Sequence, residues 1–463
     1  MAKLWDKGYA LDELIERFTV GEDYLLDRRL VAADAVASIA HARMLGSIGL
    51  LSASDLEGLE RELGRVARVS VADGSSISRG QEDSHTFIEG LLVARLGEAG
   101  KRIHTGRSRN DQVLASTRLF AREGALAVRD GLADAVEALC SLATAEEHTP
   151  MAGRTHLQPA MPSTFGLWAA SYAEALLDAD ALLSAAYELI NRSPLGAAAS
   201  YGVPLPLDRE LVAELLGFAS VQHNVLEVVS SRGRVELALL DALDQIGIIL
   251  SRFATDLILF TLPEFGYVSL PAELCSGSSI MPQKRNPDGL ELIRGKSSTL
   301  SSYSDLVRNV VRNLPSAYNR DVQETKAPLI RGIDLAIDML AVATLTAGRL
   351  EVHPDRLAAG LTPEVFATDA ALERVVAGES FRDAYRAVAA ALESIESGAF
   401  DPAAAIAKRT STGSPGNLGL EWVRERLAAV RDDGTRKRRA ALGAVERLVG
   451  ERLPLYPGAP PGR

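Results

Sequence analysis

The chain has 463 residues, which is too long for a single hydrophobic core and favours about two to four domains. Its net charge of −11 argues against a basic surface for nucleic acid, so an anionic small molecule would have to meet local cations. Apolar residues make up 47% and aromatic residues only 5%, and the abundance of Ala, Leu and Val predicts a mostly helical protein.

The N-terminus and the cysteines give information about the cellular location of the protein. No apolar core of a secretory signal is found at the N-terminus, which starts Met1-Ala2-Lys3. The two cysteines, Cys140 and Cys275, lie far apart and lack the spacing of a metal or redox site. We therefore expect a cytoplasmic protein, and the cysteines predict neither a disulfide nor a metal centre.

Helical patterns follow one another along the chain. Ser54 and Asp55 precede apolar residues at helical spacing, which predicts a capped helix in an N-terminal helical domain, residues 1–109. Five longer helical runs then predict a central bundle domain, residues 110–361, because their lengths exceed the usual 11–12 or so residues. The runs cover residues 110–145, 164–190, 227–262, 290–311 and 330–350.

The most apolar stretch, residues 237–262, is not expected to cross a membrane. It contains Asp241, Asp244, Arg252 and Asp256, and charges that frequent are prohibitive in lipid. The long runs are apolar around much of their circumference, which predicts burial on several sides. One chain alone would leave wide apolar surface exposed, so we expect copies of the chain to associate.

The pattern changes after residue 361. Shorter helical runs with more breakers predict a small C-terminal helical domain, residues 362–463. Four prolines near the end, Pro454, Pro457, Pro460 and Pro461, predict a frayed tail.

Residues 277–287 combine hydroxyls, amides and cations in a way that no core helix or strand needs. Gly277 allows a close approach of the backbone to a ligand, while Pro282 and Pro287 limit where the Lys284 ammonium can point. These residues predict a loop that handles an anion. The alternative is a solvated turn with incidental charge.

This loop closely resembles the signature of the fumarase/aspartase superfamily, whose members eliminate a group across the Cα–Cβ bond of a succinyl unit and release fumarate. Three further segments, residues 104–112, 153–159 and 318–324, resemble those of argininosuccinate lyases. The resemblance implies an all-α fold of three helical domains, with a central bundle of five long helices. It also implies a homotetramer with active sites built from three subunits, and cleavage of argininosuccinate to fumarate and arginine without a metal or organic cofactor.

The same resemblance suggests catalytic residues. Removing a proton next to a carboxylate generates a doubly negative aci-carboxylate, which Lys284 and Asn286 would stabilise. Ser278 matches the position used for acid/base catalysis, and we favour it as the base at Cβ. It would need its alkoxide stabilised by backbone N–H groups and by Lys284. His156 is its expected counterpart, and the reverse assignment, with His156 as the base, stays open.

Other matching positions are expected to hold the substrate. For the carboxylates of the succinyl part they are Ser108, Arg109, Asn110 and Thr155. For the remaining substrate contacts they are Tyr318, Arg320, Gln323 and Lys326.

Three positions carry open alternatives. Arg320 could instead pair with Asp321 or a neighbouring chain, and His85 could be structural. Asp23 replaces the small hydroxyl residue that commonly contacts the amino-acid end of the substrate, and its carboxylate could bind an α-ammonium. Rival functions are an adenylosuccinate lyase or aspartase, a related structural protein without activity, and a coiled-coil scaffold. Residues 108–111 and 318–321 argue against the first of these, and the combination of Ser278, His156, Lys284 and Asn286 argues against the inactive structural protein. A scaffold is disfavoured because loops with so much reactive polarity serve no packing purpose.

Overall fold

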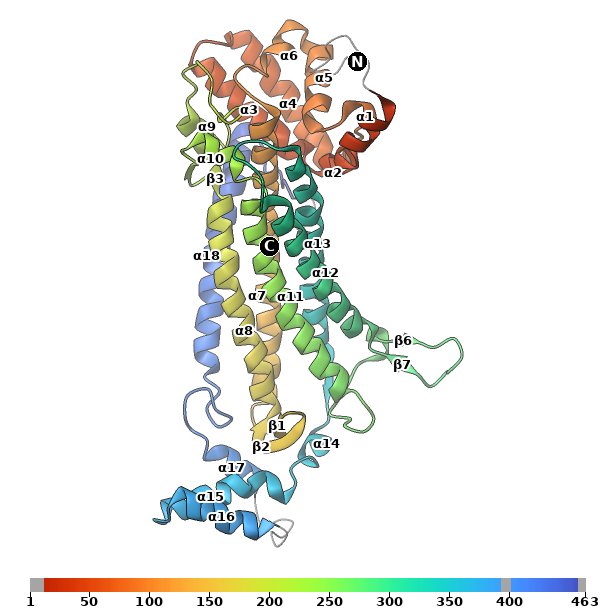
Figure 1. Cartoon of the computed structure of the whole chain (residues 1–463), viewed down its shortest axis with the longest axis vertical. Helices are drawn as coiled ribbons and strands as arrows, with labels where there is room; N and C mark the ends of the chain where they lie inside the picture. Colours follow the sequence, from red (N-terminus) through yellow and green to blue (C-terminus); the bar gives the residue numbers. More distant parts are fainter. Residues whose placement is uncertain (1–11, 393–400, 457–463) are drawn as a thin grey trace.

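The computed structural model describes residues 12–392 and 401–456, and it shows an elongated, almost entirely helical molecule (Figure 1). Long helices run along the axis, the first helices of the chain gather at one end, and short helices gather at the other. The all-α fold class is therefore confirmed. The N-terminal residues Met1, Ala2 and Lys3 and the prolines Pro457, Pro460 and Pro461 lie outside the described residues.

The N-terminal end consists of short and medium helices. They are α1 (Glu13–Val20), α2 (Asp23–Leu26), α3 (Val31–Ser47), α4 (Ala53–Asp73), α5 (Ser84–Leu96) and α6 (Glu98–Arg102), with the 3₁₀ turns η1 (Asp27–Arg29) and η2 (Arg79–Gln81). Helix α4 begins earlier than Ser54 and Asp55 predicted, because Ser52 is the cap: its Oγ accepts from the Asp55 N–H at 3.1 Å.

Five long helices form the bundle, as predicted. They are α7 (Arg109–Ala145), α8 (Phe165–Ile190), α11 (Arg234–Phe260), α12 (Asp288–Val311) and α13 (Lys326–Arg349). The short helix α9 (Arg209–Leu215) lies beside the N-terminal end.

The predicted helix over residues 227–262 is wrong in one respect, because it is two helices. Helix α10 (Val225–Ser230) ends before Gly233, whose φ of +83° is a left-handed conformation. A Cβ at this glycine would lie 2.4 Å from Val311 Cγ1, so the close approach of α12 also requires glycine. Helix α11 starts directly after this break.

Asp256, one of the charged residues inside the apolar stretch of α11, has partners on α8. Asp256 Oδ2 accepts from Trp168 Nε1 at 2.9 Å and from Tyr172 Oη at 2.6 Å, both on α8. No helix among the described residues is long and apolar enough to cross a membrane.

The strands are short and pair in four separate sheets. Two antiparallel hairpins are β1 (Pro150–Thr155) with β2 (Gln158–Thr164) and β6 (Ser276–Gly277) with β7 (Arg285–Asn286). The other pairs are β3 (Arg192–Ser193) with β4 (Ser220–Val221), parallel, and β5 (Val268–Ser269) with β8 (Glu351–Val352), antiparallel; η3 (Ala272–Leu274) follows β5.

The C-terminal part differs from its prediction in one helix. Short helices α14 (Pro354–Ala358), α15 (Ala367–Val376), α16 (Phe381–Ala390) and α17 (Pro402–Ala407), with η5 (Pro363–Phe366), agree with the expected shortening. However, α18 (Leu420–Val449) has 30 residues and runs back along the bundle against α7 and α8 (Figure 1). Helix α18 was not predicted because its many charged residues make its apolar stripe, which includes Leu420, Val423 and Leu427, difficult to recognise in the sequence.

Candidate active site

A polar cleft lies at the N-terminal end of the bundle. The start of α7, the turn η4 (Arg320–Thr325), the start of α13 and the segment around α2 and η1 form its walls. Six predicted substrate-holding residues line it together: Arg109, Asn110, Tyr318, Arg320, Gln323 and Lys326. Two sequence blocks that are some two hundred residues apart thus meet in one chain.

Ser108 contributes to this cleft as a helix cap. Its Oγ accepts from the Asn110 N–H at 3.3 Å, while its own N–H donates to Asp111 Oδ1 at 2.9 Å. The other Asp111 oxygen accepts from the Gly196 and Ala198 N–H groups at 3.0 and 2.9 Å, so the first turn of α7 is tied to a neighbouring loop. The capped helix start brings the positive end of a long helix to the cleft, which favours an anion there.

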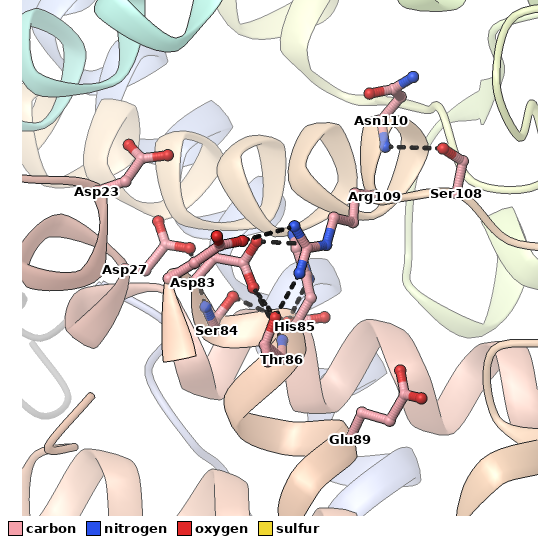
Figure 2. A network of polar contacts seen from close by, with 12 residues as sticks. Asp23, Asp27, Asp83, Ser84, His85, Thr86, Glu89, Ser108, Arg109 and Asn110 are labelled. Carbon is pink, nitrogen blue, oxygen red and sulfur yellow. Dashed lines mark hydrogen bonds and ion pairs between the residues drawn. The ribbon is translucent and has the colours of Figure 1, made fainter. Parts of the chain in front are cut away.

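Arg109 is held by the segment at the start of α5 (Figure 2). Its Nη1 donates to Glu82 Oε2 at 3.1 Å, its Nη2 donates to Thr86 Oγ1 at 2.5 Å, and its Nε lies 3.6 Å from Asp83 Oδ2. These contacts fix the plane of the guanidinium, which is the property a carboxylate holder needs.

Lys326 lies at the bottom of the cleft in a buried ionic cluster. Its side chain is only 3% exposed, and its Nζ lies 2.6 Å from Asp27 Oδ1 and 3.2 Å from Asp23 Oδ1. Burial alone would lower the pKa of Lys326, but the two carboxylates outweigh it, so the pKa is raised and the ammonium stays charged. Burial, with the neighbouring Asp27 charge, raises the pKa of Asp23.

His85 is buried beside the same cleft and paired with Asp34. Its Nδ1 lies 2.6 Å from Asp34 Oδ2, which also accepts from Ser84 Oγ at 2.9 Å. Burial opposes the charged form, but Asp34 more than offsets this and raises the pKa of His85. His85 Nε2 is buried and has no hydrogen-bond partner within the described part of the chain. His85 also lines the cleft, and a histidine with a purely structural role would not need to lie there.

Arg320 and Gln323 hold the N-terminal segment. The Thr19 carbonyl accepts from Arg320 Nη2 at 2.8 Å and from Gln323 Nε2 at 3.1 Å. Arg320 thus uses a backbone carbonyl rather than the Asp321 carboxylate. These two contacts place Asp23, which is four residues after Thr19, in the cleft beside Lys326.

The hairpin of β6 and β7 carries Ser278, Lys284 and Asn286 away from this cleft. It projects sideways from the bundle near its far end (Figure 1). Ser278 Oγ accepts from the Met281 N–H at 3.1 Å and from the Ile280 N–H at 3.4 Å. Asn286 Nδ2 donates to Ser276 Oγ at 3.4 Å, and the Lys284 ammonium is exposed, with no ion pair to any residue that the structure describes.

The hairpin of β1 and β2 carries Thr155 and His156 at the opposite end of the molecule from the cleft (Figure 1). Thr155 and Gln158 pair at the end of the hairpin, so His156 and Leu157 form its turn. All four residues are exposed in the single chain.

The three groups of predicted residues are therefore not brought together within one chain. Helix α7 has 37 residues and separates the cleft from the β1–β2 hairpin by roughly 55 Å at about 1.5 Å per residue. Helix α12 has 24 residues and separates the β6–β7 hairpin from η4 by roughly 36 Å. Each group is intact locally, and each is incomplete as an active site.

Sequence reasoning missed several residues of the cleft. Asp27 and Arg232 line it, as do Glu82 and Asp83. Asp27 offered a signal, since it stands four residues after Asp23 and can share a helical face with it. Arg232 offered none, because nothing in its neighbourhood distinguishes it from a surface arginine.

Comparisons with known proteins bear on all of these segments. A family model described as "Lyase" matches residues 7–300. The chain is 45% identical over 425 residues to the argininosuccinate lyase of Sorangium cellulosum (strain So ce56), covering 92% of this chain and 98% of that protein. It is 43% identical over 387 residues to the argininosuccinate lyase of Thermotoga neapolitana (strain ATCC 49049 / DSM 4359 / NBRC 107923 / NS-E), covering 84% of this chain and 97% of that protein.

Solved structures agree on the fold. An EDDS lyase in complex with formate superposes with a TM-score of 0.80 at 22% identity, covering 96% of this chain and 97% of that one. A class II fumarase from Schistosoma mansoni superposes with a TM-score of 0.69 at 15% identity, covering 92% and 95%.

Proposed function

Since the chain belongs to the argininosuccinate lyase family within the fumarase/aspartase superfamily, we propose how its residues divide the work of that reaction. The protein is a carbon–nitrogen lyase that cleaves argininosuccinate to fumarate and L-arginine, the last step of arginine biosynthesis. The reaction is a β-elimination, in which the Cβ proton and the guanidino nitrogen leave the succinyl unit.

The main chemical obstacle is the aci-carboxylate that forms when the Cβ proton leaves. We assign its stabilisation to Lys284 and Asn286 on the β6–β7 hairpin. Each preorganised donor of this kind supplies about 3–4 kcal/mol in a site that excludes water. The exposed Lys284 ammonium is available for that role, because no described carboxylate neutralises it.

Ser278 removes the proton in this scheme. The observation that carries it is that the Ile280 and Met281 N–H groups both point at Ser278 Oγ, at 3.4 and 3.1 Å. Two backbone donors on one hydroxyl oxygen favour its alkoxide. His156 then protonates the departing guanidino nitrogen. If His156 were the base instead, the Ile280 and Met281 N–H groups that point at Ser278 Oγ would have no catalytic role.

The cleft residues hold the two ends of the substrate. Carboxylates of the succinyl part are bound by Ser108, Arg109 and Asn110 at the positive end of α7. Thr155, on the β1–β2 hairpin, binds them as well. Tyr318, Arg320, Gln323 and Lys326 contact the rest of the substrate. Asp23, at the mouth of the Lys326 cluster, receives the α-ammonium of the arginine end.

The complete site requires more than one copy of the chain. The separations along α7 and α12 support a homotetramer in which each active site takes the cleft from one subunit and one hairpin from each of two others. The division into domains 1–109, 110–361 and 362–463 and a cytoplasmic location complete this proposal.

A spectrophotometric assay tests the function directly. Purified protein mixed with argininosuccinate should show the ultraviolet absorbance of fumarate. Adenylosuccinate and aspartate serve as controls, and a signal with either of them but not with argininosuccinate would overturn the substrate assignment. Silence with all three substrates would favour a structural protein that has kept the fold without the activity.

A further inference from the structure

The turn that carries His156 has an unfavourable backbone for its residues. Thr155 and Gln158 are the last paired residues of the hairpin, so His156 and Leu157 alone make the turn. Their φ angles are +54° and +63°, both left-handed. Turns of this kind strongly prefer Asn and Gly, because a bulkier side chain in this conformation crowds the following carbonyl oxygen. The turn therefore needs support from elsewhere in the structure.

Arg154 supplies a contact that fits this need. Its Nη1 donates to the Leu157 carbonyl oxygen at 3.0 Å, directly across the turn. Its Nη2 donates to Tyr267 Oη at 3.1 Å, and its guanidinium carbon lies 5.0 Å from the centre of the Phe265 ring. Leu157 cannot provide the support by packing, because 70% of the residue is exposed.

The far side of this contact is anchored in the bundle. Tyr267 is 4% exposed, its N–H donates to the Phe260 carbonyl at 2.9 Å, and its own carbonyl accepts from the His353 N–H at 2.9 Å. Phe260 ends helix α11. One guanidinium therefore connects a strained, exposed turn to the rigid end of a long helix.

We propose that Arg154 is a positioning residue for catalysis: its planar fork holds the Leu157 carbonyl against Tyr267 and thereby fixes the turn that presents His156. Arg154 itself does not touch the substrate. This inference rests on the proposed role of His156 as an acid/base group. A lysine cannot replace Arg154, because an ammonium lacks the planar, two-sided donor geometry that bridges the carbonyl and the hydroxyl while lying over Phe265.

A double-mutant cycle on kcat tests the proposal. Arg154→Ala should lower kcat by about 10- to 100-fold and change KM by less than about threefold, because misplacing an acid/base group affects the transition state most. Glycine adopts a left-handed φ without a steric penalty. In the Leu157→Gly background the same Arg154→Ala change should therefore lower kcat by no more than about threefold. Equal losses in both backgrounds would overturn the proposal.

Two further variants keep the test decisive. Arg154→Lys should lose nearly as much kcat as Arg154→Ala, and a lysine enzyme with normal kcat would refute the need for a fork. If Arg154→Ala does not fold by circular dichroism and gel filtration, the cycle is run with Tyr267→Phe, which keeps the buried ring and removes the hydroxyl. A wild-type protein that forms no fumarate contradicts the proposed function, whereas an active wild type with an additive cycle contradicts only the role of Arg154.

Discussion

Arg109 and His156 stand at opposite ends of helix α7: Arg109 is its first residue, and His156 lies in the turn of the hairpin that follows its last residue. Both belong to segments that resemble the active site of one enzyme family. The rigid helix between them keeps them roughly 55 Å apart at about 1.5 Å per residue. No bending of a packed helix closes such a gap, and this separation is the reason for our proposal that a second copy of the chain brings His156 to an Arg109 cleft.

Mixing two inactive variants tests this arrangement. His156→Ala and Lys284→Ala change different hairpins, so hybrids of the two should contain some sites in which both hairpins are intact. Random exchange predicts recovery at about one site in four if the hairpins come from different subunits. Fumarate formation after denaturant-assisted subunit exchange measures this recovery.

The matched control for that mixture uses two lesions in one hairpin. Ser278→Ala mixed with Lys284→Ala should stay inactive, because every β6–β7 hairpin then carries one of the two changes. Failure of the first mixture to recover, with exchange verified by native mass spectrometry, would contradict shared sites.

Ser278→Ala should lower kcat by at least about 10³-fold with the assembly intact, because it removes a group that acts in the transition state. The neighbouring Ser279 is exposed and accepts neither of the two N–H groups that point at Ser278 Oγ, so Ser279→Ala should change kcat far less. A near-normal rate for Ser278→Ala, measured as fumarate release, would remove Ser278 from the mechanism and leave His156 as the base.

Asp23→Asn should raise KM for argininosuccinate by about tenfold with kcat within about threefold, since a contact to a remote ammonium is made equally in the ground and transition states. The asparagine keeps the size of the side chain and removes its charge. Steady-state kinetics at several substrate concentrations separate the two constants. An unchanged KM would show that the arginine end is not held by this carboxylate.

Two lysines of the site should respond differently to loss of charge. Lys326→Met leaves Asp27, which is 1% exposed, without its buried cation, and it should lower the free energy of unfolding by about 3–5 kcal/mol. Lys284→Met changes an exposed residue, so stability should stay within about 0.5 kcal/mol while kcat falls by at least about 10²-fold. Urea unfolding measures the free energy of unfolding of both variants, and the fumarate assay measures their kcat. Equal destabilisation by both changes would contradict this assignment.

The pair of His85 and Asp34 predicts a pH dependence of stability. Asp34 raises the pKa of His85 above its ordinary value of 6.5 against the opposing effect of burial. Burial would raise the pKa of Asp34, but His85 overcomes it and lowers that pKa below its ordinary value of 3.8. The pair therefore stabilises fully between these two values, and its contribution is lost as the pH rises through the raised pKa of His85 or falls through the lowered pKa of Asp34.

A His85→Gln variant should consequently lose less stability than the wild type as the pH rises above 6.5. His41 is the contrasting control, because burial lowers its pKa well below its ordinary value and its contribution is lost as the pH falls below 6.5. His41→Gln should change the slope only on that acid side. Urea midpoints measured across the range report both slopes, and identical slopes for His85→Gln and the wild type would contradict the ion pair.

Local patterns predicted much of the fold. The runs that became α7, α8 and α12 agree with the observed helices to within about two residues at each end, since apolar side chains at helical spacing have few other ways to be buried. Helix α13 begins at Lys326, four residues before its predicted start at residue 330. The break at Gly233 was missed because it depends on α12, which leaves no room there for a Cβ. Helix α18 was missed because its exposed charges dilute the stripe that packs on the bundle.

The amino-acid sequence alone indicates which segments carry the chemistry, because reactive side chains gathered in short blocks are visible without a structure. Which of these blocks lie next to one another depends on how the helices pack. Lys326 reaches Asp27 across 299 positions of the chain, and Arg320 reaches the Thr19 carbonyl across 301, both through packing that no local pattern records. The same packing keeps His156 and Ser278 away from that cleft, because rigid helices lie between them, and this is why we propose that neighbouring copies complete the site.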